Sequence, residues 1–376
     1  MSGIRVAVVG GGVCGLGVGW KLAKGGAQVT IFERDEPLHG ATWASAGMLA
    51  AQMELRPEEE NIIPLGRESM RRWRSFAREV EEDSGISVGY RDEGILFVGL
   101  DLDATEQLRF LHRHQEEVGL PVQWLSGYEA RQREPHLSRR VTAALYSSED
   151  HQVDPQALGT ALVQAFSRAG GTLRDHTPVE RILTEGERVR GVRVNGEDLQ
   201  ADAVLLAAGA WSGMVEGLPE ELSLPVRPVK GQMLAVKQPE PALIDHCVWA
   251  IDATRFVYLA PKSNGRLLIG ATVEEVGFDT EVTAGGMLDL LRIGWDTLPG
   301  IYDLPIVETW AGLRPGSRDN APILGKTPID GLYTATGHYR NGILFAPVTA
   351  EDVADLILTG ETSAAIEPFG LERFLR

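Results

Sequence analysis

The sequence has few cysteines and few basic residues for its length. Two cysteines, Cys14 and Cys247, occur in 376 residues, too few for a disulfide framework or a cysteine-rich metal site. We therefore expect no metal and a reducing compartment, the cytoplasm. Lysine and arginine number 36 against 53 aspartates and glutamates, a net charge of −17. Because this charge repels phosphate backbones and anionic lipid surfaces, we expect neither a nucleic-acid nor a membrane partner.

Long apolar runs are also absent. The longest, residues 203–211, is about half of the roughly 18 residues that a membrane span needs, and it contains Gly209. The remaining composition is ordinary, with 43% hydrophobic and 24% charged residues. Such a composition is typical of a globular chain with sizeable cores, and the length suggests about two to three domains.

The N-terminal segment has the pattern of a nucleotide-binding unit. A β-branched run over residues 4–9 predicts a strand that is buried on both faces. The next residues, Gly10-Gly11-Gly12-Val13-Cys14-Gly15, match G-x-G-x-x-G, and residues 13–24 have apolar positions at helical spacing. A second strand is predicted over residues 28–32. This order of strand, glycine loop, helix and strand predicts a dinucleotide-binding fold.

The chemistry of this unit indicates which nucleotide it would bind. Glycines let the backbone approach a pyrophosphate, and the helix N-terminus supplies N–H donors and partial positive charge. Glu33 ends the second strand, where an acid can bind a ribose hydroxyl and would repel a 2′-phosphate. We therefore expect FAD or NAD. The absence of a second G-x-G-x-x-G and of C-x-x-C argues against a disulfide reductase with two nucleotides.

Later patterns predict that the chain alternates between two domains. A helix is expected over residues 103–119 with Asp103 as its N-cap, and another follows Asp154 and Pro155. Residues 199–206 are expected to form one strand that runs into glycines, as the first strand does, so the nucleotide domain resumes near residue 150. Strands at residues 226–236, 256–259 and 267–271 predict a second, mostly antiparallel sheet, whereas residues 310–325 and 331–342 are expected to be loop-rich.

Several segments resemble the FAD-dependent D-amino-acid oxidase superfamily, and within it the glycine oxidase family of the thiazole branch of thiamine biosynthesis. They are the N-terminal unit, residues 258–272 (YLAPKSNGRLLIGAT), residues 314–317 (RPGS) with 322–325 (PILG), and residues 337–347. The resemblance covers nearly the whole chain. It implies an α/β fold, in which a Rossmann-type FAD-binding domain (residues 1–48, 150–225 and 310–376) is interleaved with an α+β substrate domain (residues 49–149 and 226–309).

The resemblance also assigns roles to three residues near the substrate. Arg314 matches the arginine that pairs with the substrate carboxylate, which suits a planar guanidinium. Tyr258 matches a tyrosine that hydrogen-bonds the same carboxylate, and Arg340 matches a residue whose backbone carbonyl accepts from the substrate amine. From the residues alone, the alternatives are a surface-loop arginine for Arg314 and a core aromatic for Tyr258.

Further residues match positions along a non-covalently held FAD or along the substrate pocket. The FAD positions are Gly10, Gly12, Val13, Cys14, Gly15, Glu33, Arg34, Thr42, Ala46, Gly47, Met48, Val179, Ala208, Gly209, Trp211, Gly337, His338, Arg340, Asn341, Gly342 and Ile343. The substrate pocket is expected to include Phe256, Val273 and Met48. Phe256 replaces a histidine of the family and Val273 a methionine, so the preferred amine stays open.

The implied activity is oxidative deamination of glycine or another small amine or D-amino acid. Hydride transfer from Cα to flavin N5 would give an imine, then an oxo acid and ammonia, with molecular oxygen as acceptor and hydrogen peroxide as product. Relatives form tetramers, so a homo-oligomer is expected. The alternatives are a D-amino-acid or hydroxyproline dehydrogenase that uses a quinone, a sarcosine oxidase, and a tRNA-modifying flavin oxidase. The net charge disfavours the last, and no cysteine follows Cys247 to tether a flavin.

Overall fold

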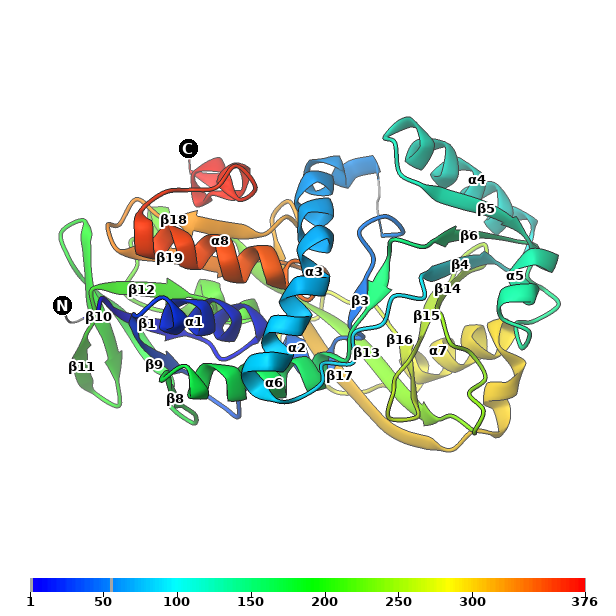
Figure 1. Ribbon diagram of the computed structural model, residues 1–376, viewed down its shortest axis with the longest axis horizontal. Helices are drawn as coiled ribbons and strands as arrows, with labels where there is room; N and C mark the ends of the chain where they lie inside the picture. Colours follow the sequence, from blue (N-terminus) through cyan, green and yellow to red (C-terminus); the bar gives the residue numbers. More distant parts are fainter. Residues whose placement is uncertain (1–2, 55–56, 376) are drawn as a thin grey trace.

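The protein is built around two large sheets that lie side by side along its longest axis (Figure 1). The computed structural model describes residues 3–54 and 57–375. The expected domain segments that begin at residue 1 or end at residue 376 are compared with the structure only within these ranges. Within them, no helix is long and apolar enough to cross a membrane. The expected α/β class, with a mostly antiparallel second sheet, is confirmed.

The first sheet has six strands and is mainly parallel. Its order is β18 (Ile323–Lys326), β19 (Leu332–Thr336), β12 (Ala203–Leu206), β1 (Arg5–Val9), β2 (Gln28–Phe32) and β8 (Thr172–Arg174). Only β18 and β19 pair antiparallel. The central strand β1 is buried on both faces because Val6 and Val8 point to one core while Ala7 and Val9 point to another.

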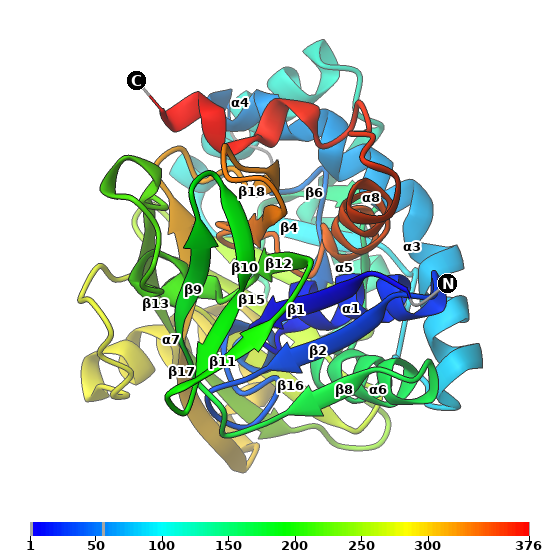
Figure 2. The ribbon, with the colours of Figure 1, turned by 90° about the vertical axis from the view of Figure 1, so that its left-hand side faces the viewer.

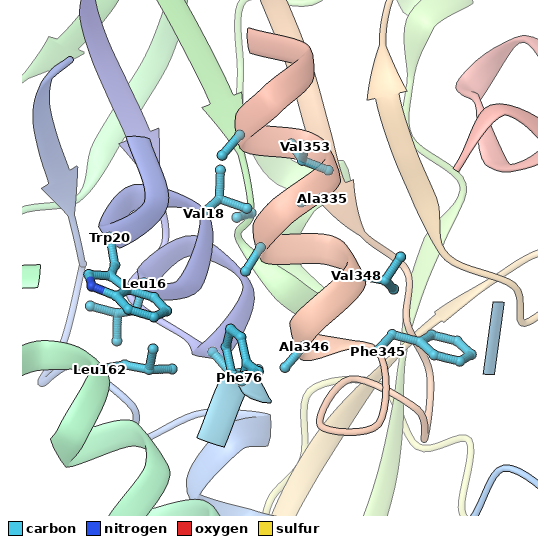
Figure 3. Close-up of a cluster of buried hydrophobic side chains, with 14 of the residues drawn as sticks. Leu16, Val18, Trp20, Phe76, Leu162, Ala335, Phe345, Ala346, Val348 and Val353 are labelled. Atoms are coloured by element: carbon cyan, nitrogen blue, oxygen red, sulfur yellow. The ribbon is translucent and has the colours of Figure 1, made fainter. Parts of the chain in front are cut away.

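Helices cover one face of this sheet, and a small sheet covers the other. The helices are α1 (Val13–Lys24), α3 (Ile63–Ser84), α6 (Pro155–Arg168) and α8 (Ala346–Thr359). In their core, Trp20 of α1 meets Phe76 of α3 edge to face, with ring centroids 5.7 Å apart (Figure 3). The opposite face packs against β9 (Val179–Glu185), β10 (Arg188–Val194) and β11 (Glu197–Gln200), which lie in front in Figure 2.

The second sheet has eight strands and is antiparallel except where β14 meets β4. Its order is β17 (Ile306–Ser317), β13 (Val226–Lys237), β16 (Arg266–Gly270), β15 (Phe256–Pro261), β14 (Cys247–Ile251), β4 (Ile95–Gly99), β6 (Ala143–Ser147) and β5 (Val122–Ser126). Helices α5 (Gly127–Arg133) and α7 (Ala284–Thr297) pack on one face, and α4 (Leu102–Glu117) packs on the other.

Short elements connect these layers. They are α2 (Ala41–Ala44), the paired strands β3 (Met48–Leu49) and β7 (His151–Gln152), and the 3-10 helices η1 (Pro57–Ile62), η2 (Gly209–Met214), η3 (Glu220–Leu222), η4 (Pro299–Asp303), η5 (Glu367–Phe369) and η6 (Leu371–Phe374). The domain boundary expected at residue 310 falls inside β17. The domain boundaries as a whole stay a prediction.

Three expectations about strands are wrong. The segments that were expected to be loop-rich contain the strands β18 and β19. Residues 199–206 form two strands in different sheets, because the chain turns at Asp202, whose carboxylate accepts from the backbone N–H and the guanidinium of Arg5. The residues from 310 to 317 are not a loop but the second half of β17. Glycine and proline are tolerated there because β17 is an edge strand with a single neighbour.

The predicted N-cap of α4 is also wrong by two residues. Helix α4 begins at Leu102, and Asp101 is its N-cap, since its Oδ1 accepts from the N–H of Ala104 at 2.8 Å. Asp103 lies in the first turn. Asp154, by contrast, caps α6 as expected by accepting from Gln156 and Ala157.

Replacing the observed cap tests this boundary. Asp101→Ala leaves the first turn of α4 without its side-chain acceptor and is expected to lower the free energy of unfolding by about 1 to 2 kcal/mol. Asp103→Ala is the matched control and should cost less than about 1 kcal/mol, because it loses only an interaction with the helix dipole. Urea denaturation followed by circular dichroism measures both. Equal losses in the two variants would contradict the assignment.

Candidate active site

One cavity joins the two sheets. Its volume is about 730 Å³, within the range of ligand sites. On the side of the six-stranded sheet, it is lined by residues that follow the carboxyl ends of β1, β2, β12 and β19. Ligands of open parallel sheets bind at this edge, where the chain leaves neighbouring strands in opposite directions. On the other side it is lined by strands of the eight-stranded sheet.

The glycine loop after β1 brings backbone close to backbone. Gly10 has φ +110°, and a Cβ there would lie 2.5 Å from the carbonyl oxygen of Ala207. A Cβ on Gly15 would lie 2.0 Å from the carbonyl oxygen of Gly10, so only glycine lets α1 approach β1 this closely. Gly12 is the N-cap of α1 and makes no side-chain capping bond. The N–H of Val13, the first residue of α1, donates to Oγ1 of Thr42 at 3.0 Å, and the positive end of the α1 dipole lies at the cavity.

The acid after β2 is held in place by the same loop. One carboxylate oxygen of Glu33 accepts from the N–H of Gly11 at 2.7 Å, and the other accepts from the N–H of Asp35 at 3.1 Å. Next to it, the guanidinium of Arg34 lies 3.7 Å from the ring centroid of Trp211, and Trp211 stacks on Phe278. These groups form a flat, partly charged wall beside Glu33.

The half-buried Cys14 and the buried His338 lie together at the cavity and are uncharged near neutral pH. The Sγ atom of Cys14 lies 3.6 Å from Nε2 of His338, which lies 3.1 Å from Oγ1 of Thr349. Burial raises the pKa of the Cys14 thiol to about 12 and lowers the pKa of His338 to about 4. The Cys14 thiol is therefore protonated near neutral pH, which disfavours a role as a thiolate nucleophile.

Arg314 and Tyr258 reach the cavity from different strands of the eight-stranded sheet. The Nη1 atom of Arg314 donates to the carbonyl oxygens of Lys230 and Thr272, both at 3.2 Å. The phenol of Tyr258 contacts Sδ of Met233 at 3.3 Å. Burial raises the pKa of Tyr258 to about 12, although nearby Arg314 opposes the shift. A protonated phenol and a guanidinium thus lie together as hydrogen-bond donors.

Each of these side chains occupies a space that a glycine leaves open. A Cβ on Gly231 of β13 would lie between 2.4 and 2.6 Å from the Arg314 guanidinium, and a Cβ on Gly270 of β16 would lie 2.7 Å from the Tyr258 ring. The register of β13 with β17 and of β15 with β16 creates both spaces. Sequence reasoning missed Gly231 and Gly270, because the strand pairing that gives them this role is not visible in the sequence.

Arg340 lies on the loop after β19, and its side chain is bonded to acidic residues. It donates to the carbonyl oxygen of Glu54 at 3.0 Å and to the carboxylate of Glu59. Burial disfavours the charge on Arg340, but Glu54 and Glu59 outweigh this effect and raise the pKa of the guanidinium. The side chain thus ties the loop to the segment that carries Glu54, another cavity residue that sequence reasoning missed.

Most of the predicted site residues line this one cavity, but three do not. Gly15, Gly337 and Asn341 are absent from its lining. Gly15 acts through packing, as described above, and Gly337 has φ +71° with Ser317 and Ile323 packed where a Cβ would be. Asn341 is buried, and its carbonyl oxygen accepts from the N–H of Phe345.

The remaining predicted residues are brought together. Those that line the cavity are Gly10, Gly12, Val13, Cys14, Glu33, Arg34, Thr42, Ala46, Gly47, Met48, Val179, Ala208, Gly209, Trp211, Phe256, Tyr258, Val273, Arg314, His338, Arg340, Gly342 and Ile343. The roles of the individual residues stay predictions. The glycine loop, the fixed carboxylate of Glu33 and the size of the cavity fit an adenine dinucleotide, and they fit FAD in particular because the same cavity continues to a pair of donors for a substrate anion.

Comparison with known proteins agrees with this arrangement. Residues 5–356 match the sequence model of the DAO family, described as FAD dependent oxidoreductase. A glycine oxidase of Geobacillus kaustophilus is 38% identical over 372 residues, covering 98% of this chain and 97% of that protein. Its crystal structure superposes with a TM-score of 0.90 at 37% identity, with 98% of both chains covered.

A second relative has an additional part. The bifunctional protein ThiO/ThiG of Trichormus variabilis is 35% identical over 375 residues, which span 98% of this chain but 55% of that protein. This chain therefore corresponds to about half of the bifunctional protein. With the family match over residues 5–356 and the similarity to glycine oxidase along nearly its whole length, the chain belongs to the DAO family of FAD-dependent oxidoreductases.

Proposed function

We propose that this chain catalyses FAD-dependent oxidative deamination of a small amino acid. One observation carries the proposal: Arg314 and Tyr258 place two hydrogen-bond donors in the same cavity as the glycine loop and Glu33. A guanidinium and a protonated phenol suit a carboxylate, and a flavin site beside them suits oxidation at the adjacent carbon. The glycine oxidases among its relatives support the same activity.

The residues of this chain bind and orient the substrate. Arg314 would pair with the substrate carboxylate, and the hydroxyl of Tyr258 would donate to it. The backbone carbonyl of Arg340 would accept from the amine, as in the family. Bound FAD supplies the acceptor for the hydride that leaves Cα. Because orientation suffices for this chemistry, no side chain needs to act as acid or base.

The overall reaction balances with molecular oxygen as the final acceptor, which is also part of the proposal. The substrate loses a hydride from Cα and a proton from nitrogen and becomes an imine, which water converts to an oxo acid and ammonia. The two electrons and two protons leave on oxygen as hydrogen peroxide.

Two further parts of the proposal concern the setting of the enzyme. A homo-oligomeric assembly is supported by the family resemblance, and a cytoplasmic location by the small number of cysteines. The ThiO/ThiG relative supports a link to the thiazole branch of thiamine biosynthesis.

Anaerobic mixing with substrate tests the activity directly. The FAD-loaded protein is mixed with glycine, sarcosine and D-alanine, and the flavin absorbance is followed. We expect at least one of these amino acids to bleach it. Arg314→Ala should lower kcat/KM by about 30-fold or more, because a buried charge pair is lost. An FAD-loaded protein that no amino acid reduces, or turnover unchanged in Arg314→Ala, would overturn the proposal.

Gly231 is expected to act as a positioning residue. Gly231→Ala places a methyl group where the Arg314 guanidinium lies, so kcat/KM should fall by about 10- to 100-fold, mainly through a higher KM. Gly285→Ala, at a position of α7 with open space around the added methyl, is the matched control and should leave both constants unchanged. The prediction fails if Gly231→Ala keeps its KM while binding FAD normally.

The pH profile separates the substrate amine from Tyr258. Since the pKa of Tyr258 is raised to about 12, the phenol stays a donor while the substrate ammonium loses its proton. We therefore expect kcat/KM to rise on the alkaline side, because only the neutral amine has a lone pair to assist hydride loss. Tyr258→Phe should lower kcat/KM by about tenfold or more without changing the shape of the profile. A profile that loses its alkaline rise in Tyr258→Phe would assign the titration to the tyrosine instead.

A further inference from the structure

The wall beside Tyr258 presents an aromatic ring that is not covered by protein. Phe256 precedes Tyr258 by two residues on β15, so both side chains lie on the same face of the sheet. The ring of Phe256 packs edge to face with three aromatic rings. The ring centroids are 5.4 Å apart for Trp249, 6.1 Å for Phe97 and 6.4 Å for Tyr258. Phe256 nevertheless remains 40% exposed and lines the cavity. The uncovered part of this ring is an apolar surface next to the proposed carboxylate site.

The apolar wall continues beyond the first cavity. A second hollow of about 500 Å³ shares Phe97, Leu111 and Ile251 with it, and Leu108 and Phe110 of α4 extend its wall. The polar residues that border this hollow, Glu106 and Gln107, lie at the exposed surface of α4. A chain of aromatic and aliphatic side chains therefore leads from Phe256 toward α4.

Glycine is a poor match for such a wall. Its amine and carboxylate would be held near Tyr258 and Arg314, but it has no carbon substituent to cover the ring of Phe256. One extra methylene buried in an apolar pocket improves discrimination by about 10- to 200-fold. Ring surface that is left uncovered keeps unfavourable contact with water.

We propose that the preferred substrate is an amino carboxylate with an uncharged apolar substituent of several carbon atoms, which packs against the uncovered part of the Phe256 ring. The substituent can be the side chain of a D-amino acid or a group on the nitrogen, since both are apolar extensions of the same anchored amino carboxylate. This inference rests on the proposed function, in which Arg314 and Tyr258 hold the carboxylate.

The test compares four amino carboxylates in anaerobic reduction of the FAD-loaded enzyme. Glycine has no substituent. D-Leucine carries an isobutyl group on Cα, and N-isobutylglycine carries the same group on nitrogen. D-Asparagine is a polar isostere of D-leucine. The ratio of the limiting reduction rate to the dissociation constant is measured by stopped flow. We expect D-leucine or N-isobutylglycine to exceed both glycine and D-asparagine by about tenfold or more. Which of the two does so identifies the position of the substituent.

Variants link any preference to the ring. Phe256→Ala should reduce the advantage over glycine, measured as a ratio within the same variant, to less than about threefold. Phe256→His is the second variant, for use if Phe256→Ala does not bind FAD. It keeps a ring at this position but makes the ring polar, so it should also weaken the preference. Tyr128→Ala, at an aromatic residue of α5 that is 66% exposed and outside both hollows, is the control and should keep the full preference.

The outcomes separate this inference from the proposed function. If glycine reduces the flavin as efficiently as the larger compounds, or if the preference survives both changes at Phe256, the inference is overturned and the proposed function stands. If none of the four compounds reduces the flavin of a protein that binds FAD, and sarcosine and D-alanine do not reduce it either, the proposed function itself has failed.

Discussion

The pairing of β13 with β17 fixes the position of Arg314, and the cavity depends on it. The two strands pair antiparallel along nearly their whole length, which sets the Arg314 guanidinium against the bare backbone of Gly231. Strand β17 also contacts the loop from the nucleotide side: Nε1 of Trp310 donates to the carbonyl oxygen of Ala44 at 3.2 Å, and Gly312 lets the side chain of Ala44 approach. A single strand therefore connects the anion-binding group with the segment that lies along the cavity.

Burial widens the pH range over which several groups around the cavity stay neutral. Tyr258, Cys14 and His338 are all held in their neutral forms near neutral pH, whereas Arg340 keeps its charge because two glutamates surround it. Arg314 presents a positive charge beside the neutral phenol of Tyr258, a pair that favours an anionic substrate over a cationic one. Fixed donors of this kind need no rearrangement when the substrate binds.

Local patterns in the sequence were sufficient for the nucleotide half of the site. The strand, glycine loop, helix and Glu33 lie within 33 consecutive residues, so their spacing alone predicts how they come together. The cap at Asp154 was predictable for the same reason. The cap of α4 was not, because Asp101 and Asp103 are equally good candidates and only the backbone path distinguishes them.

The substrate half could not be predicted from local patterns. Arg314 and Tyr258 were identified only through the family resemblance, and the glycines that accommodate them come from partner strands far away in the sequence. Residues 310–317 look like a loop because glycine and proline are poor strand formers, yet they are tolerated at the edge of a sheet. Phe97 and Trp249 reach Phe256 only through the neighbouring strands β4, β14 and β15, a relation that depends on the complete sheet order.

The most direct test of the central claim uses a carboxylate that cannot be oxidised. Acetate is titrated into the FAD-loaded enzyme and into its Arg314→Ala variant, and the flavin difference spectrum is recorded. If Arg314 holds a carboxylate beside the flavin, acetate will give a saturable spectral change in the unaltered enzyme that is lost in the variant. The same saturable change, with the same dissociation constant, in both proteins would contradict the account.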